Sequence, residues 1–451
     1  MKKNDIVQVE IEDFGMNGQG VGKVQGQVIF VPYAIIGEIH EVVIIYVAKS
    51  FCVGKTLQIL KKSAIRQQPK CMYYHQCGGC TLQHIKYEHT LQYKRAEVQK
   101  AFDTIAKQSI SVLPTVPSES IYEYRNKAAF PIAMVQGSVV LGMYRAGTHV
   151  VVPIKRCVLQ HPAIHKVMEI FCAWANQANL TVYTEATHWG LLRYLVVRVV
   201  GNGVLVCVVV NGSFVPQIQA LYTALKQEFE EVGLSININT QKTNVILNQT
   251  GFVQIAGKEQ LCGEAFGITF PISSGSFMQI NESIRNCIYQ KVLQQVQAYM
   301  SVIDAYAGAG LLTSMCAKRV KQAYGIEIIP QAVQNANALA ESNGLTNVQN
   351  ICGDVVEVLP KFVKKVNAQE CAIILDPPRK GCEPKVMQTV ASFAPEKIVY
   401  VSCNPQTLAR DIQEFFKSAK QKYTLQFVQP YDMFPQTGHV ETVAVLVKNQ
   451  K

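Results

Sequence analysis

The stretch VIDAYAGAG, Val302 to Gly310, decides the fold of the C-terminal part of the chain. Its first residues are apolar, as in a buried strand, and the Gly308-Ala-Gly310 turn is typical of a strand that passes into a helix beneath a bound nucleotide. A complete dinucleotide fingerprint would have a third glycine at position 313, where this sequence has Thr313. The pattern therefore predicts a nucleotide-binding α/β domain and disfavours NAD.

Around this stretch, further short strands separated by helical stretches are predicted at QAYGIEI, NVQNICGD, CAIILDPP and KIVYVSCNP. Such a rhythm predicts a parallel, doubly wound sheet over residues 271–451, with its site at the carboxyl ends of the strands. Glu327 follows the glycine turn by about twenty residues and is suited to accept hydrogen bonds from ribose hydroxyls. Asp354 ends the next run and is placed for an adenine. A Gly-x-Gly turn followed by such an acid is typical of folds that bind S-adenosylmethionine.

Two further domains are expected before this one. Residues 1–60 alternate short β-type runs with glycine turns, which predicts a small OB-like β-barrel. Residues 61–270 begin with a basic linker and a cysteine cluster. They continue with strand-length apolar runs and a helical segment near 163–178, which predicts a mixed α+β domain rich in antiparallel sheet. The whole chain is thus predicted to be a multidomain α/β protein.

Composition narrows the class of protein. The 451 residues include 43 Lys and Arg against 32 Asp and Glu, a formal charge of +11 that is compatible with a polyanionic partner without naming one. Neither a signal-peptide core nor a membrane span can be drawn, so we expect a cytoplasmic protein. In a reducing compartment the fourteen cysteines are not a disulfide framework, and some are expected to be metal ligands or nucleophiles.

The stretch IVYVSCNPQTLARD places one thiol, Cys403, at the end of a predicted strand, where Asn-Pro stops it. A thiolate there suits methylation of a pyrimidine at C5, because a covalent bond to C6 makes C5 nucleophilic. A base must then remove the C5 proton. The later stretch TGHVETVAVL offers Glu441, with His439 on the same face if the segment is extended. Cys403 could instead be an ordinary core cysteine, but the predicted methyl-donor site beside it favours a role as the nucleophile.

The stretch LDPPR, which begins with Leu375, resembles the acid-Pro-Pro-aromatic motif of enzymes that methylate amino groups. Arg379 stands where the stacking aromatic ring would be, so amino-nitrogen methylation is the weaker interpretation. Even if the prolines only stiffen the loop, Asp376 is expected at the edge of the site.

The stretch CMYYHQCGGC holds Cys71, Cys77 and Cys80, a spacing that fits a metal or an iron-sulfur cluster better than packing. The fourth ligand must come from elsewhere, and the candidates are Cys157, Cys52, His75 and His84. We favour a 4Fe-4S cluster with Cys157, because the second short knuckle usual in structural zinc sites is absent. Zinc is the alternative.

Taken in order, these motifs resemble those of the bacterial 23S rRNA uracil-5-methyltransferases with an N-terminal TRAM domain, members of the RNA 5-methyluridine methyltransferase family. The resemblance covers nearly the whole chain and is most specific in the four-cysteine pattern ending at Cys157 and in SFMQIN (276–281), DAYAGAG, LDPPRKG, VSCNP and TGHVETV. It implies a TRAM β-barrel, a central domain with a cluster and a Rossmann-like class I methyltransferase domain.

The resemblance also implies roles for individual residues. It makes Cys403 the nucleophile and Glu441 the proton acceptor. It places Gln279, Tyr306, Glu327 and Asp376 at the S-adenosylmethionine site, and it makes Cys71, Cys77, Cys80 and Cys157 the ligands of a 4Fe-4S cluster. Because relatives that modify tRNA generally lack the barrel and the cluster, it favours 23S rRNA or its assembly intermediates as the partner, with no membrane and no obligate protein partner.

The RNA itself is expected to meet the barrel and basic residues of the central domain. The candidates for phosphate contact are Arg125, Lys127, Arg145, Lys155 and Arg156. The target uracil is expected to leave its stack and to be held by an aromatic ring, Tyr306 or Phe277.

Several alternatives stay open at this point. A tRNA uracil-5-methyltransferase shares the chemistry. An RNA cytosine-5-methyltransferase shares the covalent logic, although no cysteine here follows a proline. A radical S-adenosylmethionine enzyme needs a C-x3-C-x2-C cluster, whereas this one is C-x5-C-x2-C. A simple RNA-binding module leaves Cys403 and Glu441 without a use.

Overall fold

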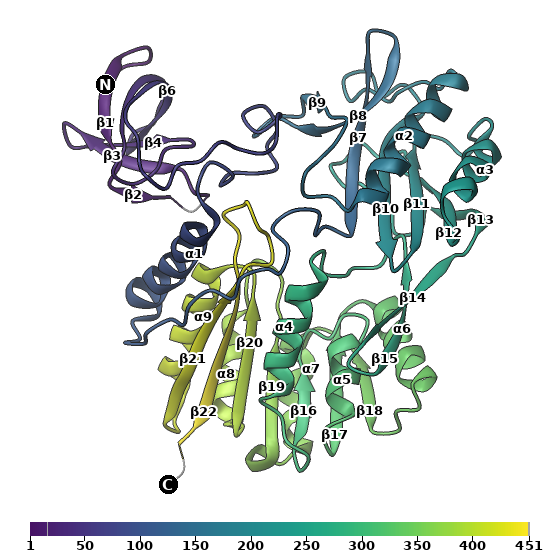
Figure 1. Ribbon diagram of the computed structural model, residues 1–451. Helices are drawn as coiled ribbons and strands as arrows, with labels where there is room; N and C mark the ends of the chain where they lie inside the picture. The colour runs from purple at the N-terminus through teal and green to yellow at the C-terminus, as the bar shows by residue number, and fades with distance from the viewer. Residues whose placement is uncertain (16, 450–451) are drawn as a thin grey trace.

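The computed structural model describes residues 1–15 and 17–449. In that part of the chain, three large sheets of six, seven and seven strands follow one another, and a two-stranded sheet lies between the second and the third. Figure 1 shows the N-terminal sheet at the upper left, the central sheet at the upper right and the C-terminal sheet below both. No described helix is long and apolar enough to cross a membrane.

The N-terminal sheet has the order β1-β5-β6-β4-β3-β2 and curls into a small barrel (Figure 1). Alternation of apolar and polar residues buries one side of each strand, with Val9, Ile29 and Val42 fully enclosed. The strands are β1 (Ile6–Glu10), β2 (Asp13–Phe14), β3 (Gly20–Val24), β4 (Gln27–Val31), β5 (Ile39–Val47) and β6 (Phe51–Lys61).

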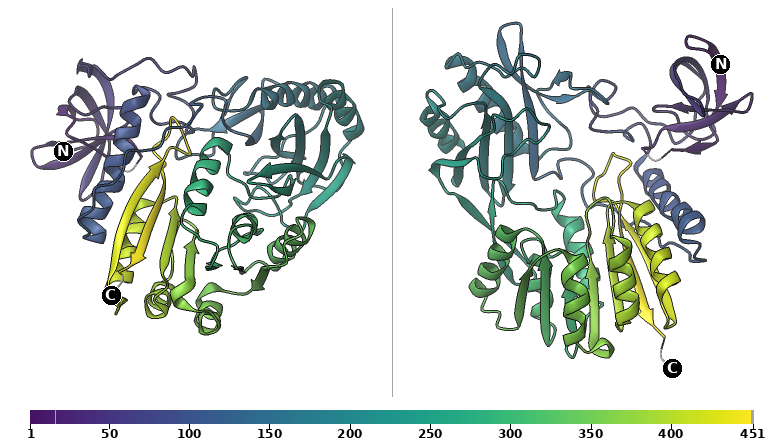
Figure 2. Two further views of the ribbon diagram at one scale, coloured as in Figure 1. Left: turned by 60° about the horizontal axis from the view of Figure 1, so that its bottom comes forward. Right: turned by 180° about the vertical axis from the view of Figure 1, so that it is seen from behind.

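The central sheet has the order β13-β12-β11-β10-β7-β8-β9 and is antiparallel except between β11 and β12. Helices α2 (Pro162–Gln177) and α3 (Ile218–Glu228) cover one face of it, as Figure 2 shows from two further sides. The strands are β7 (Lys127–Val135), β8 (Ser138–Tyr144), β9 (Val151–Pro153), β10 (Leu192–Val200), β11 (Gly203–Val210), β12 (Val232–Ile238) and β13 (Phe252–Gly257).

The C-terminal sheet has the order β18-β17-β16-β19-β20-β22-β21. Its strands are β16 (Ser301–Asp304), β17 (Gln322–Glu327), β18 (Val348–Cys352), β19 (Cys371–Leu375), β20 (Lys397–Ser402), β21 (Tyr423–Tyr431) and β22 (Glu441–Lys448). Strands β16 to β20 are parallel, as the sequence pattern predicts. Strand β22 is antiparallel to both neighbours, because the short connection from β21 cannot make the long crossover that parallel strands need.

The helices of this domain alternate with its strands. They are α4 (Glu282–Leu293), α5 (Leu311–Ala317), α6 (Pro330–Ser342), α7 (Val355–Phe362), α8 (Pro384–Phe393) and α9 (Pro405–Ser418). Two short 3-10 helices, Val363–Lys365 and Ala368–Glu370, follow α7. The two-stranded sheet β14 (Gln260–Ala265) and β15 (Ile268–Ser273) connects this domain to the central one.

One segment of the range 61–270, which the sequence assigns to the central domain, packs into the C-terminal domain instead. Helix α1 (Tyr87–Ala101) and the π-helix Phe102–Ala106 pack into the C-terminal domain, where Val98 and Phe102 join the core of Ile398 and Phe415. The helix is polar on average, so its narrow apolar stripe did not reveal which sheet it would cover.

Helix α1 also holds the segment that leads into β22. Lys94 and Asp432 are both fully buried and form an ion pair, and the Tyr87 hydroxyl donates to the other Asp432 oxygen at 2.7 Å. The segment between β21 and β22 rises toward the other two domains (Figure 1, yellow). Because Asp432, the first residue of this segment, bonds to Lys94 and Tyr87 of α1, the helix helps to fix the position of the segment before β22.

Candidate active site

The expected site residues lie at the carboxyl ends of the parallel strands. Asp304 ends β16, Glu327 ends β17, and Asp376 follows β19 directly. Cys403 follows β20, and Asp354 follows β18 by one residue beyond Gly353. One edge of the sheet therefore gathers residues from five strands, as the doubly wound topology requires.

Cys403 and Glu441 come from strands that pair with each other. Ser402 in β20 pairs with Thr442 in β22, so the next two residues along the antiparallel ladder are Cys403 and Glu441. The thiol is half-buried, and Glu441 is only 4% exposed. The two side chains are thus neighbours although 38 positions separate them in the sequence.

The electrostatics of this pair suit covalent chemistry. Burial and, to a smaller extent, Asp376 raise the pKa of Glu441, Arg379 lowers it, and the net value is about 8. Burial also raises the pKa of the Cys403 thiol, as do Glu441 and Asp376, while Arg379 lowers it. A Glu441 that keeps its proton near neutral pH removes one negative charge from beside the thiol, so the thiolate forms more readily.

Arg379 is the residue whose role the sequence did not reveal. In the sequence it stands out only as the replacement of an aromatic ring, yet it lowers the pKa of Cys403, Glu441 and His439. Its carbonyl accepts long hydrogen bonds from Asn404 Nδ2 and Thr407 Oγ1 at 3.4 and 3.5 Å. The sequence signal that could have revealed this role is its position in the loop that follows Asp376, two residues beyond the first of the two prolines.

His439 does not lie in a strand, because β22 begins only at Glu441. Its ring packs edge-on against Phe434, with the ring centroids 5.9 Å apart.

The glycine turn has the shape expected beneath a nucleotide. The Gly308 N–H donates to Glu327 Oε2 at 3.0 Å, and the Ile329 N–H donates to Oε1 at 2.9 Å. A Cβ added at Gly308 would meet nothing within 4 Å, whereas one at Gly310 would meet the Ala336 Cβ at 2.6 Å. The carboxylate of Glu327 is thus fixed by two donors and keeps acceptor sites for ribose hydroxyls.

Acids and a phenol line the neighbouring strand ends. Asp304 is buried, its pKa is raised by desolvation to about 6, and it accepts a hydrogen bond from Thr313 Oγ1 at 2.7 Å. Desolvation is the main cause that raises the pKa of Asp376, and the charge of Asp304 adds to it. The residue as a whole is nevertheless exposed to solvent. Tyr306 is half-buried, and burial together with Cys382 raises its pKa. Asp354 Oδ1 caps helix α7 through the Val356 N–H at 2.9 Å.

Gln279 lies in the segment between β15 and α4. Its carbonyl accepts a hydrogen bond from Asn126 Nδ2 at 3.5 Å. Two residues later, Asn281 caps α4 and donates to the Ser118 hydroxyl and the Met433 carbonyl. Contacts with the central domain and with the β21–β22 segment therefore position the Gln279 segment.

The structure places Cys157 near the loop that carries Cys71, Cys77 and Cys80. Burial raises the pKa of Cys71, Cys77 and Cys80, and the nearby Cys157 contributes to each increase, which for Cys80 reaches about 12. Cys52, another candidate ligand, is instead enclosed in the barrel core. The Gly78 N–H donates to the Tyr144 carbonyl, which places the cysteine loop beside β8.

Two observations bear on whether this loop suits a metal. The Gly79 N–H donates to Cys77 Sγ at 3.3 Å, and a set of four thiols is the donor set that iron-sulfur clusters use. Over residues 1–15 and 17–449, however, no three or more His, Cys, Asp and Glu side chains form a group that could hold a metal ion. The candidate histidine His84 bonds instead to the Tyr74 hydroxyl at 2.7 Å.

The expected phosphate-binding residues have different surroundings. Arg145 and Lys155 are exposed, and Arg156 is exposed but pairs with Glu123 at 2.8 Å. Arg125 lies over the Tyr124 ring, and its charge lowers the pKa of Cys77 and Cys80. Its guanidinium therefore lies near the cysteine loop. Lys127 is half-buried in β7.

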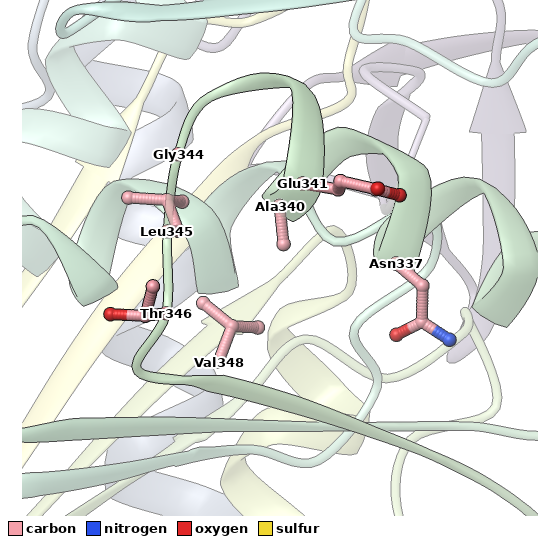
Figure 3. Close-up of a pocket in the computed structure, with 7 residues that line it drawn as sticks. All are labelled: Asn337, Ala340, Glu341, Gly344, Leu345, Thr346 and Val348. Atoms are coloured by element: carbon pink, nitrogen blue, oxygen red, sulfur yellow. The ribbon is translucent and has the colours of Figure 1, made fainter.

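A pocket of about 310 Å³ lies away from this site. Figure 3 shows Asn337, Ala340 and Glu341 of α6 on one side of it and Leu345, Thr346 and Val348 on the other. Val348 begins β18, so the pocket lies at the amino end of that strand, opposite to the edge that carries the acids. It is therefore separate from the candidate active site.

Comparisons with known proteins agree with this site. Residues 86–449 match the family described as tRNA (Uracil-5-)-methyltransferase, and residues 2–57 match the TRAM domain. An uncharacterized RNA methyltransferase of Clostridium acetobutylicum is 35% identical over 459 residues, covering 100% of this chain and 99% of the relative. Another from Halalkalibacterium halodurans is 35% identical over 453 residues, covering 99% and 98%.

A solved structure is similar over the same length. The Pyrococcus abyssi tRNA (uracil-54, C5)-methyltransferase, in complex with S-adenosyl-L-homocysteine, has a TM-score of 0.79 and 26% identity, covering 98% of this chain and 99% of that one. The expected barrel, methyltransferase domain and methyl donor are thereby confirmed at the level of the family. The chain belongs to the S-adenosylmethionine-dependent RNA uracil-5-methyltransferase family and carries a TRAM domain at its N-terminus.

Proposed function

We propose that this protein methylates C5 of a uridine in 23S rRNA, with Cys403 as the nucleophile and Glu441 as the proton acceptor. The observation that carries the proposal is the pairing of β20 with β22, which makes these two residues neighbours at the sheet edge. A thiol that can add to C6, next to a buried carboxyl whose raised pKa makes its ionised form a stronger base for the C5 proton, is what a covalent C5 methylation needs.

The reaction proceeds by addition and elimination. The Cys403 thiolate bonds to C6 of the uracil, and the electrons of the C5–C6 double bond move toward the C4 carbonyl, so that C5 becomes nucleophilic. When bound, S-adenosylmethionine would supply the methyl group that C5 accepts and would be left as S-adenosylhomocysteine. Glu441 then takes the C5 proton, the double bond re-forms, and the carbon–sulfur bond breaks to release the thiolate.

Four residues would hold the methyl donor. Glu327 has free acceptor sites for the ribose hydroxyls, and the open space above Gly308 admits a ligand close to the backbone. Tyr306, Asp376 and Gln279 complete the set that the family resemblance implies. Tyr306 or Phe277, which is 88% exposed, would stack on the RNA.

The choice of RNA is the finer part of the proposal. The order of motifs resembles the ribosomal RNA enzymes and supports 23S rRNA. A specific observation favours a second candidate, because the archaeal tRNA enzyme covers 98% of this chain, which includes most of the barrel. The barrel is therefore no marker of ribosomal RNA, and tRNA is the second candidate substrate.

We also propose that Cys71, Cys77, Cys80 and Cys157 hold a 4Fe-4S cluster, with zinc as the alternative. Support comes from Cys157, which raises the pKa of Cys71, Cys77 and Cys80 and therefore lies near the loop that carries these three thiols. A cluster there would fix the fold of the central domain, because metal binding supplies folding free energy. Iron and sulfide analysis of anaerobically purified protein tests this, and zinc in their place would contradict it.

The test of function uses methyl-labelled S-adenosylmethionine with unmodified 23S rRNA and unmodified tRNA in parallel, followed by nuclease mapping. Labelled 5-methyluridine in 23S rRNA is the expected result, and label in tRNA alone would keep the chemistry and replace the substrate. Cys403→Ala should abolish both turnover and an SDS-stable adduct with 5-fluorouridine RNA. The control is Cys262→Ser, which alters an exposed thiol of β14 and should keep both.

A further inference from the structure

The segment of residues 432–440 joins β21 to β22 and leads directly to the proposed base, Glu441. Tyr431 pairs with Glu441 in the antiparallel ladder, so the two ends of the segment meet. The structure describes the whole segment, which has no regular secondary structure, yet most of its residues are buried. Because a buried irregular chain must find partners for its backbone N–H and C=O groups, the contacts of this segment determine its shape.

The residues that follow Cys80 supply several of these partners. The Thr81 and Leu82 N–H groups both donate to the Gln436 carbonyl at 3.1 Å. In the opposite direction, the Gly438 N–H donates to Thr81 Oγ1 at 3.1 Å. Thr81 therefore contacts the segment at two positions, and Leu82 reinforces one of them.

Gln436 has a conformation that needs such support. Its φ is +70°, in the left-handed region that residues with a side chain adopt only rarely. It is 1% exposed, and neither Nε2 nor Oε1 has a hydrogen-bond partner among the described residues. Both features cost free energy, so the conformation persists only where the surroundings determine it strongly. The two N–H groups on its carbonyl belong to those surroundings.

The other hydrogen bonds from outside hold the earlier part of the segment. The Met433 carbonyl accepts from Asn281 Nδ2 at 3.3 Å, and the Pro435 carbonyl accepts from the Tyr124 hydroxyl at 3.1 Å. Beyond Gly438, the His439 N–H donates to Thr437 Oγ1 within the segment. Among the described residues, Thr81 thus provides the last hydrogen bond from outside the segment before Glu441.

The carboxyl of Glu441 has no hydrogen bond of its own to fix it. Burial and the charges of Asp376 and Arg379 account for its pKa, with no contribution from a hydrogen bond to the described residues. Its place beside Cys403 therefore depends on the backbone, which the ladder of β22 holds on one side and the 432–440 segment on the other. A catalytic group tolerates a displacement of only about 0.5 Å.

Cys403 is positioned separately from this segment. It follows β20, and the turn around it is closed by hydrogen bonds between its two neighbours. Ser402 Oγ donates to the Asn404 carbonyl at 3.1 Å, and the Asn404 N–H donates back to Ser402 Oγ at 3.1 Å. A change in the 432–440 segment should therefore affect the base more than the nucleophile.

We propose that Thr81 is a positioning residue for the elimination step, in which it keeps Glu441 at the C5 proton by holding Gln436 and Gly438. The inference rests on the proposed function in taking Glu441 as the base. In the step concerned, the C5 proton passes to Glu441, the C5–C6 double bond re-forms and the bond from C6 to the Cys403 sulfur breaks. Because Thr81 follows Cys80 directly, whatever orders the cysteine loop also orders this contact.

The experiment compares Thr81→Val and Thr81→Ser with a matched control, Thr223→Val. Valine removes the oxygen that accepts the Gly438 N–H and keeps the shape of the side chain, whereas serine keeps that oxygen. Thr223 is an exposed threonine of α3, where its hydroxyl donates to the Gln219 carbonyl at 3.1 Å. The substrate is the RNA that the labelling experiment identifies.

Single-turnover reactions quenched in SDS separate the two steps. RNA with 5-fluorouridine measures formation of the adduct alone, because its C5 fluorine cannot leave as a proton, and uridine RNA measures decay. Thr81→Val should form the 5-fluorouridine adduct at the wild-type rate and resolve the uridine adduct about tenfold more slowly, a part of the roughly 10²- to 10⁴-fold that a positioned general base contributes. Thr81→Ser should restore most of the decay rate, and Thr223→Val should match the wild type.

Amide hydrogen exchange without RNA tests the contact independently of activity. In Thr81→Val, peptides that cover residues 433–440 should exchange faster, because the Gly438 N–H has lost its acceptor. Peptides from α3 should exchange as in the wild type, and Thr81→Ser should protect the segment again.

Several outcomes would overturn the inference. Formation and decay slowed to the same extent in Thr81→Val would show a general loss of structure. Faster exchange with normal decay would show that Thr81 holds the segment without positioning Glu441, and unchanged exchange would show that the contact does not hold the segment. Glu441→Gln distinguishes the two hypotheses. If it resolves the adduct normally, the base assignment of the proposed function fails; if it accumulates adduct while Thr81→Val does not, only the role of Thr81 fails.

Discussion

Glu441 should give the release step a pH dependence that can be calculated from its surroundings. With a pKa of about 8, its carboxyl is roughly 1% ionised at pH 6, about 10% at pH 7 and about half ionised at pH 8. If Glu441 removes the C5 proton, the rate of that step should rise about tenfold from pH 6 to pH 7 and about fivefold from pH 7 to pH 8, then level off.

The assay is single-turnover methylation with quenching in SDS, which counts the covalent enzyme–RNA adduct and the finished product at each pH. Two protonations compete, and they have opposite effects on the adduct. A protonated Cys403 cannot form the adduct, whereas a protonated Glu441 cannot resolve it. Slow release at pH 6 should therefore appear as adduct that accumulates and decays slowly.

Glu441→Gln should accumulate adduct at every pH, with no dependence of its decay on pH. The control, Glu228→Gln, changes a surface carboxyl of α3 and should reproduce the wild-type profile. Decay that is equally fast at pH 6 and pH 8, or a Glu441→Gln protein that turns over normally, would refute the reasoning. The same raised pKa implies a stability contribution that is complete below pH 4.5 and is lost as the pH rises through about 8.

Three other changes have definite expected outcomes. Asp432→Asn should lower the free energy of unfolding by about 3–5 kcal/mol in urea titrations, because it leaves Lys94 charged and buried; Asp432→Leu combined with Lys94→Met should recover much of that loss. Cys157→Ser should remove the visible absorbance of the proposed cluster and lower the melting temperature, while Cys262→Ser should do neither; unchanged iron content in the former would contradict the ligand assignment. Glu38 is fully buried in the barrel, and hydrogen bonds that outweigh desolvation hold its pKa below the usual range. Its contribution to the stability of the barrel should therefore be complete above pH 4.5 and be lost as the pH falls below that value. Acid titration of the wild-type and Glu38→Gln proteins would show this difference.

The local motifs at the strand ends were accessible to sequence reasoning for a physical reason. A parallel strand that ends in a glycine, an acid or a cysteine has its functional residue at a known edge of the sheet, whatever the rest of the chain does. The sequence alone therefore places Glu327 and Asp376 at that edge. The family of the chain follows from the same motifs taken in order.

Pairings between distant segments depended on tertiary structure. Helix α1 is too polar on average to reveal that Val98 and Phe102 belong to the C-terminal core, and only packing shows it. The charge of Arg379 acts through space on Cys403 and Glu441, so its place on the Pro-Pro loop becomes informative only when the folded sheet brings the three residues near one another.

The sequence by itself determined the class of chemistry, the order of the domains and the strand-end residues, because these depend on local pattern and periodicity. Only the tertiary structure decided that Glu441 lies beside Cys403, because β22 enters the sheet antiparallel to β20. Only it showed that Thr81, next to the cysteine loop, contacts the segment that leads to Glu441. The first result depends on strand register and the second on packing between domains, and both are set by the whole fold and not by any one segment.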